Sequence, residues 1–473
     1  MSLKTSETTR YLCASAFLSG VSFREAILKP FREAHRAAAP ELGADMKLVA
    51  QVCKFADRRA TLYAIGFALF LIPAAIVEAT IIPDVALGLY VLLAILAGLL
   101  YFVKTYHERY SLICPFLRQS FNPIEVAQKY PSSFKPSSDG AVSQPDQNLV
   151  VYGGFLPFVG AGLDLGGWSF AVSTIKPTEE IHSSSKPSTF TITELYSEIE
   201  SGMDSLGIDE MHSEDFYFVS GTDIRGDREI LANEYGRPRQ TLRPEVASTY
   251  KDSCDSRIRH YKWIRVEDWG GELIMSMFLR CTLRGNNLFV EMKRFLLTPV
   301  AQQYRTVDKI GSPTVTTRIT WFIGSMIVGP FYVLYAVFFL FGRVTQKIVN
   351  MFGAEDRKVR QEIRNNLLFN YGAEKSLRTT FSSSEFQHYF QKLDTDFYGK
   401  VLERQILDSI VGFLDEHHID TSDIKESKNT ILNSGIIVQG GDVKAESLAV
   451  GAGAKAIKSG FATLKKKAKG AEA

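Results

Sequence analysis

The chain has 473 residues, which is long enough for two or three units that each bury a core. It carries 54 Lys and Arg against 52 Asp and Glu, so its net charge of +2 excludes a globally basic surface, and we expect no nucleic-acid partner. Its cysteines are far apart and form no CxxC pair, which predicts reduced cytosolic thiols at Cys13, Cys53, Cys114, Cys254 and Cys281.

Residues 1–60 place apolar side chains at helical spacing, as in Phe23, Ile27 and Phe31, between charged residues. This pattern predicts a helical cytosolic segment. The start of the chain lacks the pattern of a cleavable signal peptide. Its basic residues, such as Arg24 and Lys29, either contact anionic headgroups or are only solvated, and the sequence leaves both readings open.

Residues 61–103 contain two uncharged apolar runs, 61–77 and 85–103, that are each long enough to cross a bilayer core of about 30 Å. The loop between them contains Pro83 and carries only acidic charges, whereas Lys and Arg stand before the first run and after the second. We therefore predict a transmembrane hairpin with both flanks in the cytoplasm.

A third apolar run covers residues 319–342 and is predicted to be a transmembrane or re-entrant segment. Gly329 and Pro330 interrupt its middle, and a basic cluster follows it from Arg343 to Arg364. A bent segment that returns to the cytosolic side satisfies both the charge rule and the helix breaker. We therefore favour this path, which keeps the C-terminus in the cytosol, while a full span that places it outside stays open.

Residues 104–147 are a connector and a Pro-, Ser- and Asp-rich linker, and residues 148–307 are predicted to fold as a soluble α+β domain. Strand patterns at 149–152, 168–172, 216–219, 259–266, 272–283 and 288–297 follow one another largely without crossover helices. The predicted sheet is therefore mainly antiparallel. A helix is expected over 191–206, with Thr193 as its N-cap.

Residues 343–425 form a predicted helical region, in which apolar positions from Phe386 to Phe413 need a partner to cover them. Residues 426–473 are predicted to be a Gly-rich β tail with a basic end. Short β segments with open edges favour self-association or capture by a partner strand. We thus expect a protein partner, or a second copy, at this tail, besides the lipid bilayer.

The candidate ligand site is the Gly-rich string from Tyr152 to Trp168, which follows a predicted strand. Backbone N–H groups of such a loop are able to hold a phosphate, but neither the dinucleotide nor the P-loop pattern is complete. A purely structural turn is the other explanation of the string. The candidate ligand-binding residues are Gly153, Gly154, Gly160, Gly162, Asp164 and Trp168.

No other pattern assigns chemistry. The eight histidines form neither an HExxH motif nor a zinc spacing, so no metal site is predicted and the cofactor is unknown. The mixed-charge stretch 223–239 is typical of an exposed loop, and no nucleophile elbow occurs, so the catalytic residues are unknown.

The string YGGFLPFVGAG at 152–162 and the tail ILNSGIIVQGG at 431–441 resemble a group of uncharacterised actinobacterial membrane proteins with a YGGxxPFVGxG loop and an ILNSGxIVxGG tail. The resemblance covers a small part of the chain. It implies a bacterial plasma membrane setting, and it implies neither an activity nor a catalytic residue.

The leading hypothesis is a multi-pass protein of the bacterial plasma membrane, with the N-terminus and residues 104–318 in the cytoplasm, that acts as a scaffold or regulator through protein contacts. One alternative is a membrane-bound enzyme or ligand sensor that uses the Gly-rich loop. A second is a small oligomeric channel, although the apolar runs contain no charge that marks an ion path.

Overall fold

The computed structural model describes residues 6–80, 83–131, 134, 140–142, 144, 146–177, 187–251, 257–311, 313–351, 353–433, 438–439 and 442–443. The chain divides into two compact units, and each is made of segments that are distant in the sequence. Unit 1 contains 1–34, 45–141 and 301–369, and unit 2 contains 35–44, 142–300 and 370–473. The predicted β tail, residues 426–473, falls in unit 2. Its first residues, 426–433, are helical and belong to α13 (Ser422–Asn433), so the prediction of β structure is wrong there. Beyond α13 the structure describes two short strands of the tail, and the basic end lies outside the described residues.

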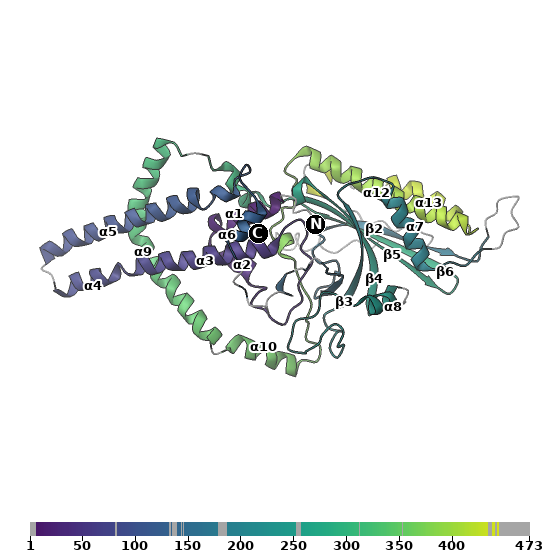
Figure 1. The fold of residues 1–473 in the computed structure, drawn as a ribbon, viewed down its shortest axis with the longest axis horizontal. Helices are drawn as coiled ribbons and strands as arrows, with labels where there is room; N and C mark the ends of the chain where they lie inside the picture. Colours follow the sequence, from purple (N-terminus) through teal and green to yellow (C-terminus); the bar gives the residue numbers. More distant parts are fainter. Residues whose placement is uncertain are drawn as a thin grey trace, which may run out of the picture. The chain divides into compact units, whose positions relative to one another are not determined.

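Unit 1 is helical (Figure 1). Its α-helices are α1 (Glu7–Leu18), α2 (Gly20–Leu28), α3 (Met46–Ala68), α4 (Leu71–Thr80), α5 (Pro83–Tyr106), α6 (Pro123–Lys129), α9 (Val315–Met351) and α10 (Ala354–Asn365). Short π or 3-10 turns are η1 (His107–Ser111), η2 (Cys114–Phe116), η5 (Gln302–Tyr304) and η6 (Thr306–Lys309).

Three helical stretches are long and apolar enough to cross a membrane: Met46–Ala75, Leu87–Phe116 and Val315–Val349. The prediction of three membrane-seeking segments is therefore confirmed in helix length and apolar composition. The first stretch begins well before the uncharged run, because α3 continues from the charged N-terminal region directly into the apolar residues.

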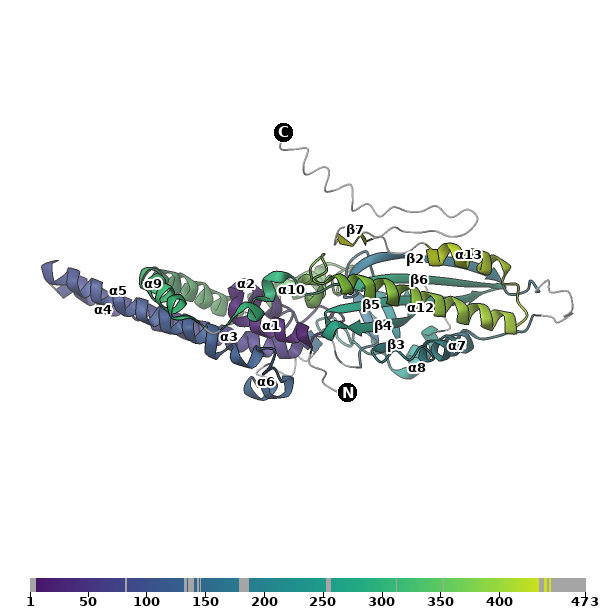
Figure 2. The ribbon, with the colours of Figure 1, turned by 90° about the horizontal axis from the view of Figure 1, so that it is seen from above.

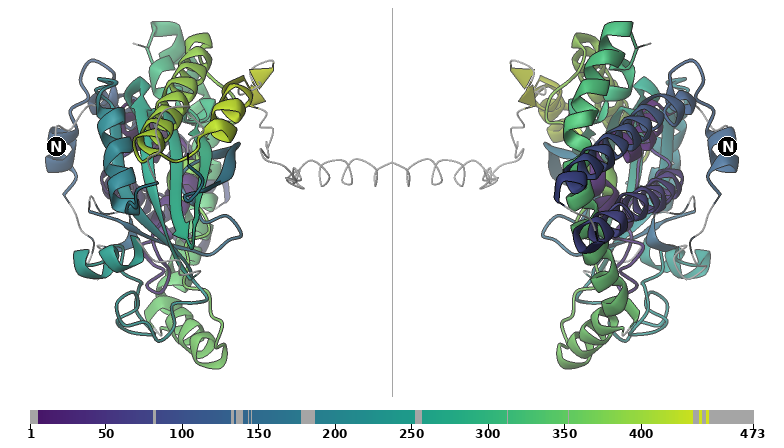
Figure 3. Two further views of the ribbon diagram at one scale, coloured as in Figure 1. Left: turned by 90° about the vertical axis from the view of Figure 1, so that its right-hand side faces the viewer. Right: turned by 90° about the vertical axis from the view of Figure 1, so that its left-hand side faces the viewer.

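Helix α9 passes across α3 and α5 (Figures 1 and 3). Near its start, Trp321 packs against Tyr110 beyond the end of α5, and Gly329 then packs directly on the backbone of Gly98. Near its end, Arg343 forms an ion pair with Asp57 of α3. Small residues at the crossing allow this close approach. Pro330 lies inside a helix that continues through it.

Unit 2 contains a six-stranded sheet in the order β1-β3-β4-β5-β6-β2. Only β1 and β3 pair in parallel, so the predicted mainly antiparallel α+β fold is confirmed. The strands are β1 (Leu149–Tyr152), β2 (Leu163–Ser173), β3 (Met211–Ser220), β4 (Ile258–Asp268), β5 (Leu273–Arg284) and β6 (Asn287–Leu297). The remaining elements are α7 (Ile192–Asp204), α8 (Pro244–Lys251), η4 (Trp269–Gly271), α11 (Leu377–Thr380), α12 (Tyr389–Glu416), α13 (Ser422–Asn433), β7 (Val438–Gln439) and β8 (Asp442–Val443).

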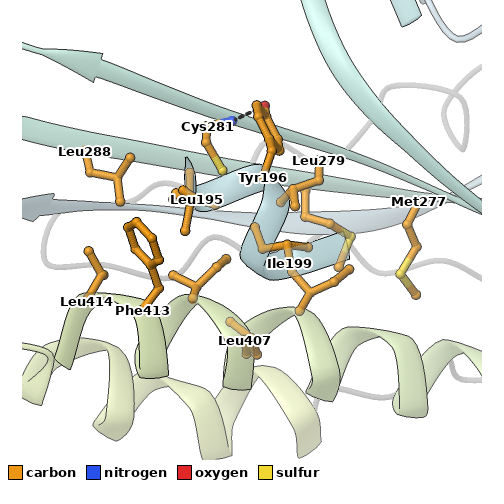
Figure 4. Close-up of a cluster of buried hydrophobic side chains, with 14 of the residues drawn as sticks. Leu195, Tyr196, Ile199, Met277, Leu279, Cys281, Leu288, Leu407, Phe413 and Leu414 are labelled. Carbon is orange, nitrogen blue, oxygen red and sulfur yellow. Dashed lines mark hydrogen bonds between the residues drawn. The ribbon is translucent and has the colours of Figure 1, made fainter. Parts of the chain in front are cut away.

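Helices α7 and α12 cover one face of the sheet, and α12 runs along it (Figure 2). In Figure 4, Leu195 and Ile199 of α7 and Leu407 of α12 meet strand residues such as Leu279 in a single apolar cluster. Tyr196 belongs to the same cluster, and its hydroxyl accepts a hydrogen bond from the Cys281 backbone N–H at 2.8 Å. Alternation along each strand places the other side chains on the opposite face.

That opposite face is aromatic, and Phe158 of the Gly-rich string lies on it. Its ring centroid is 4.4 Å from that of Phe278 and 5.1 Å from that of Tyr261. Leu42, from the segment 35–44, belongs to the same cluster. A sheet buried on both faces needs cover from outside the predicted domain 148–307, and residues 35–44 and 370–433 supply it.

The capping residue of α7 differs from the expectation. Thr193 is the predicted N-cap, but Thr191 is the residue that accepts the hydrogen bond from Glu194 N–H, and the Glu194 side chain in turn accepts a bond from Thr191 N–H. This reciprocal capping box satisfies two free N–H groups, which a cap at Thr193 does not achieve.

Glu41 connects two distant segments of unit 2. Its carboxylate accepts hydrogen bonds from the backbone N–H groups of Leu377 at 2.7 Å and Arg378 at 2.9 Å. Burial raises the pKa of Glu41 to about 7, against the opposing effect of these hydrogen bonds.

The folded state therefore keeps a proton on Glu41 that the unfolded chain loses near pH 4.5. The stabilising contribution is complete below that pH and is lost as the pH rises to about 7. We expect the unfolding free energy of the wild type, compared with Glu41→Gln, to fall by about 3 kcal/mol across this window. Denaturant unfolding at several pH values measures the difference, and parallel pH profiles would contradict the assignment.

Candidate functional site

The Gly-rich loop is held by hydrogen bonds and close backbone contacts within unit 2. Gly153 N–H donates to Ala373 O at 2.8 Å, and Gly153 O accepts from Asn370 Nδ2 at 2.7 Å. A Cβ at Gly153 would lie 2.8 Å from Gly372 O. Glycine is needed here because two chain segments approach each other closely.

The later residues of the loop are also engaged. Gly160 and Gly162 have φ of +95° and +100°, and a Cβ at each would lie 2.4 Å from Pro40 O and 2.2 Å from Leu296 O. Asp164 Oδ1 accepts from the Gly166 backbone N–H at 2.7 Å, at the start of β2 where the register with β6 shifts. Trp168 is buried, and its Nε1–H donates to Glu403 Oε1 at 2.7 Å.

Among the four glycines predicted to bind a ligand, only Gly154 has open space where a Cβ would stand. The other three glycines and Trp168 contact the sheet, the segment 35–44, the segment after residue 369, or α12. These contacts account for the string without a ligand, and a ligand-binding role stays a prediction. Phe155, in contrast, is almost fully exposed.

Replacing Gly162 by alanine is expected to lower the unfolding free energy by about 1–3 kcal/mol, because the residue has a left-handed φ and faces a carbonyl oxygen. Gly154→Ala is the matched control, since its φ is not left-handed and the space around it is open. Thermal unfolding of both variants measures the difference. Equal stability of the two would contradict a structural role for Gly162.

The sheet carries a charged cluster that no sequence pattern indicates. Asp215 Oδ1 is 2.7 Å from His260 Nε2 and 2.9 Å from Lys262 Nζ, and Asp215 Oδ2 is 3.1 Å from Lys251 Nζ. Register brings the strand residues together, because Asp215 pairs with Lys262 and Tyr217 with His260 across β3 and β4. Glu200 of α7 adds a further ion pair to Lys262.

The electrostatics of this cluster follow from its burial and pairing. Burial disfavours the charged form of Asp215, but the hydrogen bond and charge of His260 and the charge of Lys262 outweigh it and hold the pKa of Asp215 well below its usual range. Burial lowers the pKa of His260 despite the opposing effect of Asp215. Asp215 is therefore ionised and accepts a hydrogen bond from the Nε2–H of His260.

An Asp–His pair orients a catalytic base in many enzymes, but here both His260 and Lys262 have side chains only 3% exposed. The Asp215 carboxylate already has three cationic or hydrogen-bonding partners. The cluster connects β3 and β4 to α7 through Glu200 and to α8 through Lys251. Among the described residues, no group of His, Cys, Asp and Glu has the arrangement of a metal site.

A prominent exposed apolar surface of unit 2 is a row at the start of α12, which we call the α12 row. It comprises Tyr389, Phe390, Leu393 and Phe397, with exposed fractions of 69%, 64%, 42% and 57%. Their spacing places Tyr389, Leu393 and Phe397 on one side of the helix. Farther along, exposed positions are charged, as at Lys400 and Arg404. Contiguous exposed aromatic residues of this kind mark interaction surfaces.

The sequence of α12 indicates part of this surface, because the helix has more apolar residues than a single face packed on the sheet needs. Several of them, including Ile406 and Ile410, are buried against the sheet, whereas the α12 row is not. Only the structure separates the two groups.

A protein-family model described as an AbeC-like domain matches residues 167–444. No curated protein and no solved structure matches the chain. The matched range starts inside β2, passes through α9 and ends just after β8. It thus contains most of unit 2 together with the third apolar helix.

Proposed function

This chain belongs to the AbeC-like domain family, and we propose that it is a membrane-anchored scaffold or regulatory protein that acts through protein contacts. The observation that carries the proposal is the α12 row, four large side chains exposed on a domain whose chain is tied to apolar helices. A second copy or another protein covering the row removes it from water.

The arrangement of the chain supports one membrane face for all of unit 2. Residues 142–300 and 370–433 share one fold, yet α9 lies between them in the sequence. A single crossing by α9 would separate them. The contacts of α9 support a shallow path. Near the two ends of its apolar run, Trp321 packs on Tyr110 and Arg343 pairs with Asp57, and both partners lie at the charged ends of the hairpin helices. The middle of the run packs on Gly98, which lies deeper.

We assign this face to the cytoplasm, because the hairpin is flanked by Arg58, Arg59, Lys104 and Arg109 and its turn carries acidic residues only. The bacterial plasma membrane is the corresponding location. The part of the tail after α13, residues 434–473, is on the same side and is a second place for contact with a partner strand.

Light scattering and chemical cross-linking of the full-length protein in detergent test this function. We expect association, as a homo-oligomer or with a co-purified protein, that weakens when Phe390 and Phe397 are both replaced by serine. The control replaces Lys400 and Arg404 by serine on the same helix. A monodisperse monomer without cross-links in all three proteins would contradict the proposal.

A further inference from the structure

Unit 1 contains a cavity at the place where its apolar helices reach their charged ends. It has a volume of about 250 Å³, and its lining includes Arg24, Arg59, Lys104, Glu108, Tyr332 and Phe339. These residues come from α2, α3, α5, η1 and α9. The cavity is therefore built by helical segments that are far apart in the sequence.

The guanidinium of Arg24 is buried without being fully satisfied. Its side chain is 8% exposed, Nη1 donates to Ala16 O at 3.1 Å, and Nε makes no hydrogen bond within the described part of the chain. The carboxylate of Asp57 is 3.8 Å away and is already paired with Arg343. A buried cation in this position is costly unless an anion completes its shell.

Arg59 repeats the pattern on α3. Its Nη2 donates to Tyr63 Oη at 3.1 Å, and its Nε is buried without a hydrogen bond from any described residue. Lys104 lines the same cavity and is paired with Glu108 at 2.8 Å. The lining therefore contains three cations, Arg24, Arg59 and Lys104, and one carboxylate, Glu108, so the cavity favours an anion.

The position of these cations along the helices sets their depth. Arg59 stands two residues before the uncharged run that starts at Thr61, and Lys104 directly follows the run that ends at Val103. Lys and Arg at such positions lie at the level of the phosphates. Tyr332 and Tyr335 of α9 also line the cavity, and tyrosine prefers this interfacial region.

We propose that this cavity binds a phosphate group through Arg24, Arg59 and Lys104, either from the headgroup of an anionic phospholipid or as a free anion. Arginine holds phosphate through paired N–H donors, and both arginines have an unused donor here. A volume of about 250 Å³ suits a headgroup and is below the range of about 300–1,000 Å³ for larger ligands. The inference does not depend on the contacts proposed for α12.

The test uses the full-length protein in a neutral detergent, titrated separately with short-chain phosphatidic acid, short-chain phosphatidylcholine and inorganic phosphate, with thermal stability as the readout. We expect phosphatidic acid to raise the melting temperature saturably and phosphatidylcholine to leave it unchanged. Arg59→Gln is expected to weaken the apparent affinity about tenfold, since it removes one charged contact.

Arg58→Gln is the matched control, because Arg58 carries the same charge on the same helix, is exposed and does not line the cavity. The contribution of Arg24 is tested in the same way with Arg24→Gln. If that variant fails to fold, Arg24→Lys replaces it, because lysine keeps the charge at the buried position. Stabilisation by phosphatidic acid alone supports a lipid headgroup, and stabilisation by inorganic phosphate as well supports a free anion. The same affinity in Arg59→Gln and Arg58→Gln, or no response to either phosphate compound, would overturn the proposal.

Discussion

Replacing Arg378 by alanine is expected to lower the unfolding free energy of unit 2 by about 3–5 kcal/mol. Arg378 is fully buried, and its Nη2 donates to Glu272 O at 3.1 Å and Thr298 O at 2.9 Å, while Nη1 donates to Ser382 Oγ. The substitution leaves two buried carbonyl oxygens without this donor and opens a cavity. Such a loss is a large part of the stability of a typical domain.

Arg404→Ala is the control, because that side chain is 70% exposed and its ion pair with Asp408 is long, at 4.0 Å. We expect a change of less than about 0.5 kcal/mol there. Denaturant unfolding followed by limited proteolysis of the full-length protein distinguishes loss of unit 2 from loss of unit 1. Similar stabilities of the two variants would show that the segment after α9 is not an integral part of the fold.

The second large effect is expected at Glu403, which connects α12 to the sheet. Its two oxygens accept from Trp168 Nε1 at 2.7 Å and Arg294 Nη1 at 3.0 Å, and both charged side chains are buried. Burial raises the pKa of Glu403 against the opposing charge of Arg294. Glu403→Ala leaves Arg294 buried without its carboxylate partner, so we expect a loss of about 3–5 kcal/mol.

A double variant separates this penalty from the net value of the ion pair. Replacing Glu403 by leucine and Arg294 by methionine removes both charges while keeping most of the volume, so the double variant should be more stable than Glu403→Ala. Equilibrium unfolding of the single and double variants forms the test. A double variant less stable than the single one would mean that the pair itself, and not the unpaired charge, dominates.

Local features of the fold were predictable from the sequence. The hairpin of β5 and β6 follows from Gly285 and Asn286 between two β-rich runs, and α7 and α12 follow from apolar spacing. The apolar helices were predictable for the same reason, because their composition alone requires them to avoid water.

Long-range features were not predictable. The boundaries of unit 2 depend on contacts such as Glu41 with Arg378, and neither residue stands in a pattern that names the other. The cluster around Asp215 depends on strand register, because His260 was visible only as one position of an alternating strand. Glycine is needed at 153 and 162 because the backbones of Gly372 and Leu296 lie directly beside these positions. The sequence alone does not show which distant segments lie there.

Reagent accessibility of two engineered cysteines tests most directly whether unit 2 lies on one membrane face. Glu198→Cys precedes α9 and Arg404→Cys follows it, and both native side chains are exposed. Cys114 and Cys254 are first replaced by serine, while buried Cys13, Cys53 and Cys281 stay. Burial raises the pKa of Cys281 to about 12, so its thiol is not expected to react.

The measurement uses a membrane-impermeant maleimide on sealed vesicles of each orientation, with detergent-opened vesicles as the full-labelling reference. We expect both engineered cysteines to be labelled in inside-out vesicles and protected in right-side-out vesicles. Labelling of the two positions from opposite sides would mean that α9 crosses the membrane fully, and it would contradict a single domain assembled from both sides of that helix.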